Sequence, residues 1–257
     1  MLEKAKILKE YKIHALDGEI GSVDEFYLDD KHMTIRYLVI DTGEGWLTGK
    51  EVLISPYAIT SLNRDQKTIY VNLTKKQIED SPSPESHKPV SRQFEASYNA
   101  YYGWPSYWAG PYAWGYYPFA GLALENWDRD RAVVDSEDRN LHSTKDVTGY
   151  HISASDGEIG HVEDFVVDCN SWTIRYLVID TSNWWIGKKV LISPLWIESI
   201  SWLEGTVVVL MTREDIQKSP EYSESVLLAR EYEAALHKHY DREGYWNIDH
   251  AGTKSVD

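Results

Sequence analysis

The sequence predicts a mainly β protein of two tandem, small, strongly bent β-barrels, each followed by short helices and joined by an aromatic-rich segment. The first observation is an internal duplication, in which 17 of the 26 residues at positions 17–42 recur at an offset of 139. The second is that each copy carries turn and strand signals, and the third is that the aromatic segment is not repeated. A repeat of about 100 residues has the size of an independent domain, whereas solenoid repeats are shorter.

The duplication also predicts the domain boundaries. At an offset of 138 the match continues through residues 52–56 and 92–96 to the Tyr-Trp pair at 107–108, which recurs at 245–246. We therefore expect a first module with its trailing helix at residues 1–97 and a connector at 98–145. A second module with its trailing helix should occupy residues 146–250, followed by a tail at 251–257.

Each copy begins with a strand, residues 11–15 in the first, and then a tight turn. Asp-Gly pairs at 17–18 and 156–157 are strong hairpin signals. In the next strand Ile20, Val23 and Phe26 are three residues apart, which breaks the alternation of a regular strand, and the second copy repeats this spacing. We expect a bulge or sharp bend there, as small closed barrels require.

The third strand, residues 34–41, is apolar on both faces in each copy. Only one face of a barrel strand points inward, so the module's own helix, the other barrel or a second chain must cover the other. Candidate interaction residues on this face are Leu38, Ile40, Leu177 and Ile179. Arg36 and Arg175, which interrupt the apolar runs, are expected to form structural ion pairs.

Three further strands, at residues 52–54, 59–62 and 68–73, complete each module. Capping boxes at Thr74 and Thr212 predict short helices, which the Ser-Pro pairs at 81–82 and 219–220 end. A later helix is predicted from residues that share one face at helical spacing, namely Leu228, Tyr232, Ala235, Leu236 and His239, with counterparts Val90, Phe94, Ser97, Tyr98 and Tyr101. This helix could cover an apolar barrel face.

The connector is unusually aromatic, because 11 of the 22 residues at 98–119 are Tyr, Trp or Phe. Three prolines in it exclude a continuous helix. It is either a flexible linker or a surface for self-association or a partner, since Tyr and Trp dominate interface hot spots. A membrane-interface belt would need an adjacent apolar span. The candidate interaction residues here are Tyr101, Tyr102, Trp104, Tyr107, Trp108, Tyr112 and Trp114.

The loop after the third strand differs between the copies. It carries Trp46 in the first copy and Trp184 and Trp185 in the second. Loops on rigid scaffolds often carry specificity, so these tryptophans are candidate interaction residues. The alternative is that they cap the mouths of the barrels.

Composition excludes several functions. The net charge of −15, with no basic patch, argues against binding nucleic acid or anionic lipid. The single cysteine, Cys169, excludes a disulfide framework and a cysteine-based metal site within one chain. No run approaches the roughly 18 apolar residues of a membrane span and no secretory signal is visible, so we expect a soluble cytoplasmic protein.

No catalytic residue, cofactor or metal ligand is expected. The sequence contains neither a glycine-rich phosphate loop nor a Gly-x-Ser-x-Gly elbow. Asp17 and Glu19 are expected to be turn and solvent-face residues. His237 and His239, two residues apart on a helix, point in different directions and could not share an ion.

Several motifs recur in both copies. They are Gly-x-x-Gly-x-Val at 18–23, Thr-Ile-Arg-Tyr-Leu-Val at 34–39, Val-Leu-Ile-Ser-Pro at 52–56 and the helix start at 73–78. The pattern resembles the PRC-barrel family, which includes the cytoplasmic domain of the photosynthetic reaction-centre H subunit and the C-terminal domain of the ribosome maturation factor RimM. The resemblance covers residues 7–82 and 146–220, about 60% of the chain. The sequence looks most like free-standing bacterial PRC-barrel proteins.

The resemblance implies bent barrels with attached helices that serve docking and assembly rather than catalysis. We therefore expect a non-catalytic interaction or assembly module whose partner is another protein or a second copy of the chain. The alternative is a soluble modulator, similar to the H subunit, that docks peripherally on a membrane electron-transfer complex without inserting into the membrane.

Overall fold

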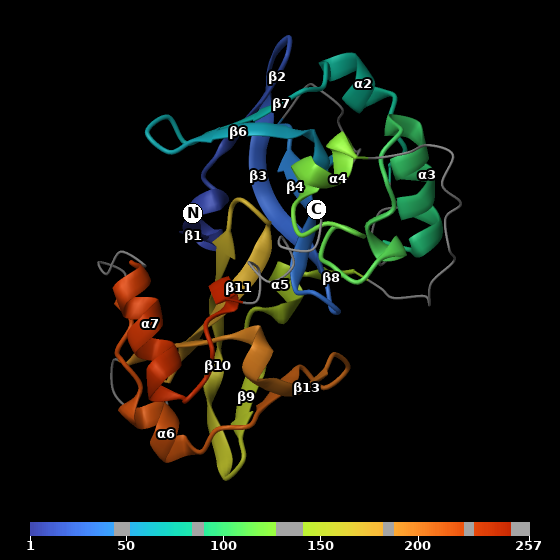
Figure 1. Cartoon of the computed structure of the whole chain (residues 1–257). Helices are drawn as coiled ribbons and strands as arrows, with labels where there is room; N and C mark the ends of the chain where they lie inside the picture. Colours follow the sequence, from blue (N-terminus) through green and yellow to red (C-terminus); the bar gives the residue numbers. More distant parts are fainter. Residues whose placement is uncertain (44–51, 84–89, 127–140, 182–187, 224–228, 248–257) are drawn as a thin grey trace. The chain divides into compact units, whose positions relative to one another are not determined.

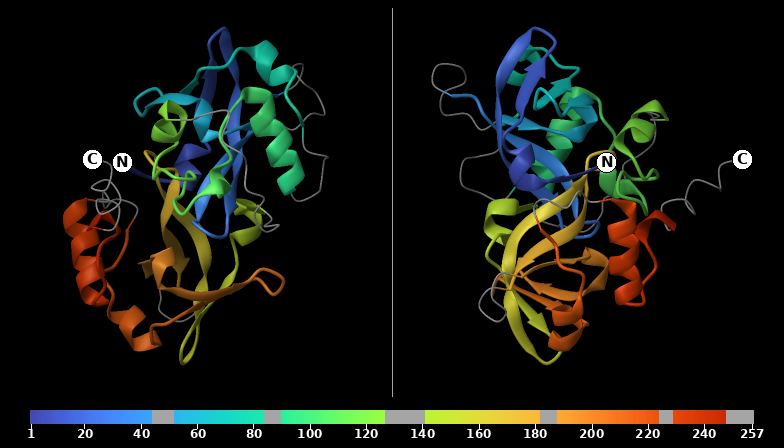
Figure 2. Two further views of the ribbon diagram at one scale, coloured as in Figure 1. Left: turned by 45° about the vertical axis from the view of Figure 1, so that its right-hand side comes forward. Right: turned by 90° about the vertical axis from the view of Figure 1, so that its left-hand side faces the viewer.

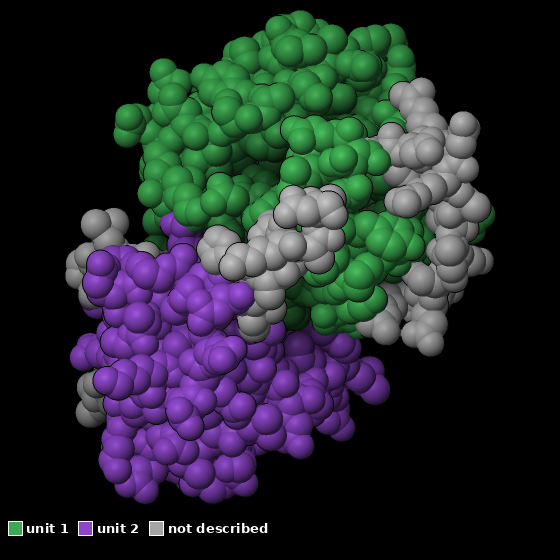
Figure 3. Space-filling model, viewed as in Figure 1, with its two compact units in different colours: residues 1, 3–145, 167–174 green, residues 2, 146–166, 175–257 purple. Residues whose placement is uncertain are grey.

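The computed structural model describes residues 1–43, 52–83, 90–126, 141–181, 188–223 and 229–247. The protein is mainly β, with 40% strand and 28% helix, which confirms the predicted class. It divides into two compact units (Figure 3), which are described separately. Unit 1 contains Met1, Glu3–Lys145 and Val167–Ile174, and unit 2 contains Leu2, Asp146–Val166 and Arg175–Asp257.

The sheet of unit 1 is mixed and strongly irregular (Figure 1). Its strands run in the order β6 (Ile59–Asn63), β7 (Thr68–Val71), β2 (Lys12–Ala15), β3 (Gly18–Asp29), β4 (Thr34–Asp41) and β5 (Val52–Ile54). The β2–β7 pair is parallel and the other neighbours are antiparallel; the short β8 (His142–Ser143) also pairs with β3. Hydrogen bonds between the described strands do not close this sheet into a barrel.

The helices of unit 1 are short and follow the strands. They are α1 (Ala5–Leu8), which comes after β1 (Leu2–Lys4), α2 (Lys75–Glu79), α3 (Arg92–Tyr102), α4 (Ala120–Glu125) and the 3-10 turns η1 (Pro56–Ala58) and η2 (Tyr107–Ala109). In Figures 1 and 2, α3 lies alongside the strands of unit 1. Because α3 runs through residues 97 and 98, it continues from the expected first module into the expected connector.

Unit 2 repeats this topology. Its strand order is β13 (Ile197–Ser201), β14 (Thr206–Val209), β9 (His151–Ala154), β10 (Gly157–Asp168), β11 (Thr173–Asp180) and β12 (Lys189–Ile192). Each of these strands has the same neighbours in the sheet as its counterpart in unit 1, and the β9–β14 pair is parallel as the β2–β7 pair is. The remaining elements also recur: η3 (Pro194–Trp196), α6 (Arg213–Lys218), α7 (Arg230–His239) and α5 (Thr144–Val147), whose first two residues fall in unit 1. The sequence duplication is therefore a duplication of strand order.

The predicted irregularity in the second strand is confirmed. The register of β3 against β2 shifts next to Gly21, and that of β10 against β9 shifts next to Gly160. Both glycines have a φ of 151°, which side-chain-bearing residues rarely adopt. A Cβ at Gly21 or Gly160 would collide with the carbonyl group of Asp41 or Asp180, respectively. Glycine is therefore required where the strand bends.

The predicted capping boxes at Thr74 and Thr212 are also confirmed. Each helix receives a second cap from far away in the sequence. The backbone N–H of Lys75 donates to Asp17 Oδ1 at 2.8 Å, and the N–H of Arg213 donates to Asp156 Oδ1 at the same distance. The turn carboxylates therefore hold the first turn of α2 and α6 in place.

The third strand is buried on both faces. Tyr37 and Val39 pack with Leu53, Val90 and Tyr98, so the module's own helix region covers this face in unit 1. The opposite face is also buried, as are the corresponding side chains of β11; these residues are Leu38, Ile40, Leu177 and Ile179. In the described structure all four are core residues, and a direct contact with a partner would first have to uncover them.

Candidate functional site

The most unusual group in the interior of unit 1 is the carboxyl of Glu95, on the inward side of α3. The Tyr107 hydroxyl donates to Oε2 at 2.5 Å, and the Tyr37 hydroxyl lies 3.5 Å from the same oxygen. Arg92, one turn earlier, places Nη1 3.2 Å from Oε1. Burial raises the pKa of Glu95 to about 7, although Arg92 and the Tyr107 hydroxyl act in the opposite direction. We call these four residues the Glu95 cluster.

Arg36 of β4 borders the Glu95 cluster and is itself buried. Its Nε lies 2.8 Å from Asp29 Oδ2, which confirms the predicted structural ion pair. Its guanidinium stacks on the Tyr107 ring, 3.6 Å from the ring centre, and lies 4.7 Å from the ring centre of Trp114. A cation held against aromatic faces is stabilised by the ring quadrupoles as well as by its carboxylate partner.

Unit 2 contains the same arrangement around Glu233. Tyr176 and Tyr245 donate their hydroxyls to Oε1 at 3.0 and 2.8 Å, and Arg230 Nη1 lies 3.1 Å from Oε2. The guanidinium of Arg175 lies 4.0 Å from the ring centre of Tyr245, as that of Arg36 lies on Tyr107. Since every participant recurs, this cluster belongs to the duplicated scaffold, and Tyr107 belongs to the module although it lies in the expected connector.

One position of the cluster region differs between the units. Asn99 in unit 1 donates to the carbonyl of Pro105 at 3.4 Å, and His237 in unit 2 contacts the equivalent carbonyl of Glu243 through Nδ1 at 2.8 Å. The Nε2 atom of His237 is 3.0 Å from the Tyr176 hydroxyl. Burial lowers the pKa of His237, and the hydrogen bond to Glu243 partly offsets this effect. Unit 2 therefore holds a buried titratable ring where unit 1 holds an amide.

The buried faces of α3 and α7 differ from the predicted ones. In α7 the buried residues are Glu233, Leu236 and His237, whereas Ala235 and His239 are exposed. In α3 the buried residues are likewise Glu95, Tyr98 and Asn99, and Ser97 and Tyr101 are exposed. Apolar periodicity missed the buried glutamates because tyrosine hydroxyls from other segments and an arginine one turn earlier in the same helix pair with them. The recurrence of Arg92, Glu95 and Tyr107 at one offset was the available signal.

The aromatic segment is anchored to unit 1 by part of its side chains. Trp104 stacks on Tyr102 with the ring centres 4.4 Å apart and the planes 15° apart. Trp114 is buried and meets Tyr57 with the ring centres 4.8 Å apart. Arg92 lies over the ring of Trp108, 4.3 Å from its centre. The segment is therefore packed on the module and does not behave as a loose linker at these positions.

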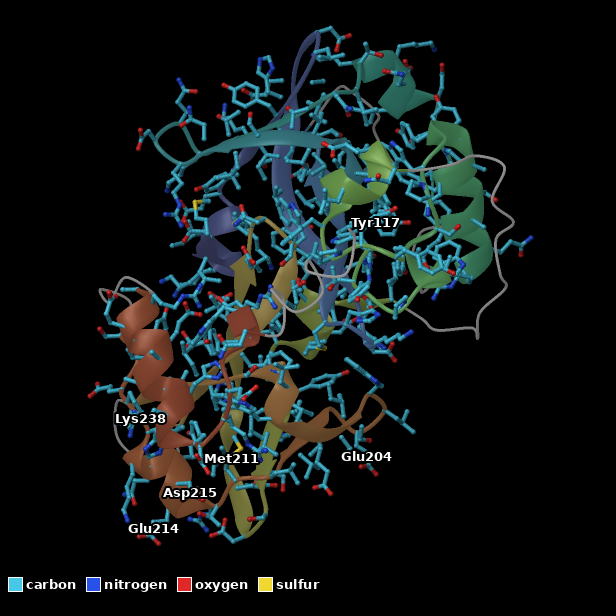
Figure 4. All side chains as sticks on the ribbon, viewed as in Figure 1. Tyr117, Glu204, Met211, Glu214, Asp215 and Lys238 are labelled. Atoms are coloured by element: carbon cyan, nitrogen blue, oxygen red, sulfur yellow. The ribbon has the colours of Figure 1, made fainter. Side chains whose placement is uncertain are left out.

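Other aromatic side chains of this segment face solvent. The exposed fraction is 38% for Tyr112 and 53% for Tyr116. These two residues are held by a tight turn in which Tyr112 pairs with Gly115 and Trp114 pairs with Tyr117, the latter labelled in Figure 4. Tyr101 is also exposed, and its hydroxyl donates to the carbonyl of Gln77 at 3.0 Å. The predicted candidates Tyr101 and Tyr112 thus lie at the surface, Tyr107 and Trp114 are buried, and Tyr102, Trp104 and Trp108 are half-buried. Candidates Trp46, Trp184 and Trp185 lie outside the described residues.

The titratable groups of the described residues outside the glutamate clusters are isolated from one another at the positions below. Within the described ranges, no three His, Cys, Asp or Glu side chains come together in a way that could hold a metal ion. Burial raises the pKa of Cys169 to about 12, so its thiol stays protonated. His239 Nε2 contacts the carbonyl of Asp215 at 2.8 Å, away from the contacts of His237. No described helix has the length and apolar character that crossing a membrane requires.

Comparison with known protein families identifies one region of the chain. Residues 11–78 match the PRC-barrel domain. The first half of unit 1 contains a PRC-barrel domain. This PRC-barrel domain includes β2 to β7 and reaches into α2, so α3 and the aromatic segment lie after it. No curated protein matches the chain.

Proposed function

We propose that the chain is a non-catalytic interaction or assembly protein built from two PRC-barrel modules. The PRC-barrel domain at residues 11–78 supports a role of this general kind. The second module is proposed because unit 2 repeats the strand order, the bulge, the helix caps and the buried glutamate cluster of unit 1.

The observation that carries the assembly role is the two-sided aromatic segment. Its inner side chains, Trp104, Tyr107 and Trp114, fix the segment on unit 1, while Tyr112 and Tyr116 are held outward. Tyrosines on a rigid turn provide a large contact area at a small cost in conformational entropy. The partner that we propose for this surface is a second copy of the chain.

The test is the molar mass of the native chain in solution, compared with the double variant Tyr112→Ser/Tyr116→Ser. We expect the native chain to have a multiple of the 29.7 kDa monomer mass and the variant to return to the monomer mass. Leu16→Ser is the matched control, because Leu16 is an exposed apolar residue of unit 1 on the β2–β3 turn. A native chain that is monomeric at all concentrations would contradict self-association.

Membrane fractionation separates this proposal from the alternative. A modulator docked on a membrane electron-transfer complex would sediment with membranes from the source cells and leave them at high salt. A self-assembling module would stay in the supernatant at its assembled mass.

A further inference from the structure

The aromatic segment of unit 1 covers a particular surface of its own module. Tyr57 of η1 is only 2% exposed, because Trp104 and Trp114 lie against its ring at 5.8 and 4.8 Å between ring centres. Trp114 also contacts the guanidinium of Arg36. Two tryptophans of one segment thus close the surface around Tyr57.

Unit 2 builds the same surface with a leucine at the central position. The residue equivalent to Tyr57 is Leu195 of η3, and both turns start from a serine whose Oγ accepts the N–H of that residue at 3.4 Å. The serine backbone angles agree closely, with φ and ψ of −76° and 145° at Ser55 and −72° and 138° at Ser193. Tyr57 and Leu195 therefore hold the same position in two turns of the same type. Leu195, however, is 61% exposed.

The covering residues of unit 1 have no aromatic counterparts in unit 2. The position of Trp104 is taken by Arg242, which is exposed, and the position of Trp114 falls on Gly252. The sequence after Asn247 contains neither tyrosine nor tryptophan. The sequence at the equivalent positions of unit 2 therefore lacks the two tryptophans that lie on Tyr57 in unit 1.

A second exposed leucine extends the uncovered surface. Leu210, 54% exposed, donates its backbone N–H to the carbonyl of Trp196 at 3.5 Å and so lies next to η3. Its counterpart in unit 1 is the polar residue Asn72. Trp196, which follows Leu195, is buried and packs on Tyr240 with the ring centres 4.9 Å apart. We call Leu195 and Leu210 the leucine patch.

We propose that the leucine patch of unit 2 is a docking site for a tryptophan-containing, glycine- and proline-rich segment of another protein chain. We infer the chemistry of the partner from unit 1, where a segment of this kind, residues 104–117, occupies the equivalent surface. An indole ring over Leu195 would bury apolar area on both sides, as tryptophan anchors do in protein interfaces. This inference rests on the proposed interaction role and names a partner for a different surface.

The test uses the intact chain and a fluorescently labelled synthetic peptide of residues 104–117. Binding followed by anisotropy should saturate for the native chain. Leu195→Asp should weaken binding about tenfold or more, because a charge replaces the anchor contact. Leu203→Asp is the matched control, since Leu203 is 99% exposed in the β13–β14 turn of the same unit. Both leucines can be found in Figure 4 from their labelled neighbours. Leu203, the control position, comes directly before Glu204, and Leu210 of the patch comes directly before Met211, with β14 between the two pairs.

Two results would overturn the inference. One is the absence of saturation with the native chain up to about 1 mM peptide. The other is equal affinity of the Leu195→Asp and Leu203→Asp variants. Circular dichroism and thermal unfolding of both variants verify that they are folded. Because the molar-mass experiment changes Tyr112 and Tyr116 only, failure of the patch and failure of self-assembly are separate outcomes.

Discussion

Replacing Glu95 by glutamine should remove a large pH dependence of stability from unit 1. The pKa of Glu95 is raised from 4.5 to about 7 in the folded protein, so the folded state binds its proton more tightly than the unfolded state. The stabilising contribution is then complete below pH 4.5 and is lost as the pH rises through 7. At about 1.4 kcal/mol per pH unit, this difference corresponds to about 3 kcal/mol. Glutamine keeps an oxygen that Tyr107 and Tyr37 can donate to, and it cannot ionise.

The assay is urea unfolding of the native chain and of Glu95→Gln at pH 5 and pH 8. We expect the native chain to lose about 2.5 kcal/mol more than the variant between these two values, because at pH 5 the carboxyl of the unfolded chain is already largely ionised. Glu19→Gln serves as a control, because Glu19 is exposed and paired with Lys12 at the surface. If the native chain and Glu95→Gln have parallel pH profiles, the carboxyl of Glu95 titrates in the folded state as it does in the unfolded state, and the reasoning is refuted.

Three further changes have defined outcomes. Gly21→Ala should lower the free energy of unfolding by about 2 kcal/mol or more in thermal denaturation, because a Cβ meets backbone there; Gly121→Ala in α4, where the space is open, should not. The native chain should lose stability as the pH falls below 6.5, because the lowered pKa of His237 keeps the ring neutral in the folded state while the ring of the unfolded chain gains a proton. His237→Asn should remove this loss, which unfolding at pH 7.5 and 5.5 tests. Asp17→Ala removes the cap on the Lys75 N–H and should cost about 1 kcal/mol in urea unfolding, with an unchanged result contradicting the capping role.

Local signals were sufficient for much of the fold. The third strand was predicted at residues 34–41, where β4 lies, and the spacing of Ile20, Val23 and Phe26 predicted the irregular register of β3. The capping box at Thr74 lies within four consecutive residues. These features depend on neighbours in the chain, so a sequence pattern can describe them.

The inward faces of α3 and α7 could not be obtained in this way. A carboxyl such as Glu95 reads as a solvent residue until Tyr107 and Arg92 are known to meet it. The same holds for the aromatic segment, since composition does not distinguish Trp114, which packs on Tyr57, from Tyr116, which faces water. Closure of the sheet also depends on long-range pairing, and the described strands leave it open.

The long-range cap on α2 has a consequence for how the protein can be divided. The hydrogen bond from Lys75 to Asp17 joins residues 58 positions apart, so the opening turn of the module is completed only after its last strand has been synthesised. Closing so long a loop costs conformational entropy, which the pairing of β2 with β7 across the same stretch of chain helps to offset. A fragment that stops before residue 75 would leave the Asp17 carboxylate without the N–H that it caps. Expression boundaries for a single module should therefore lie beyond α2, and in unit 2 beyond α6, where Asp156 plays the same part.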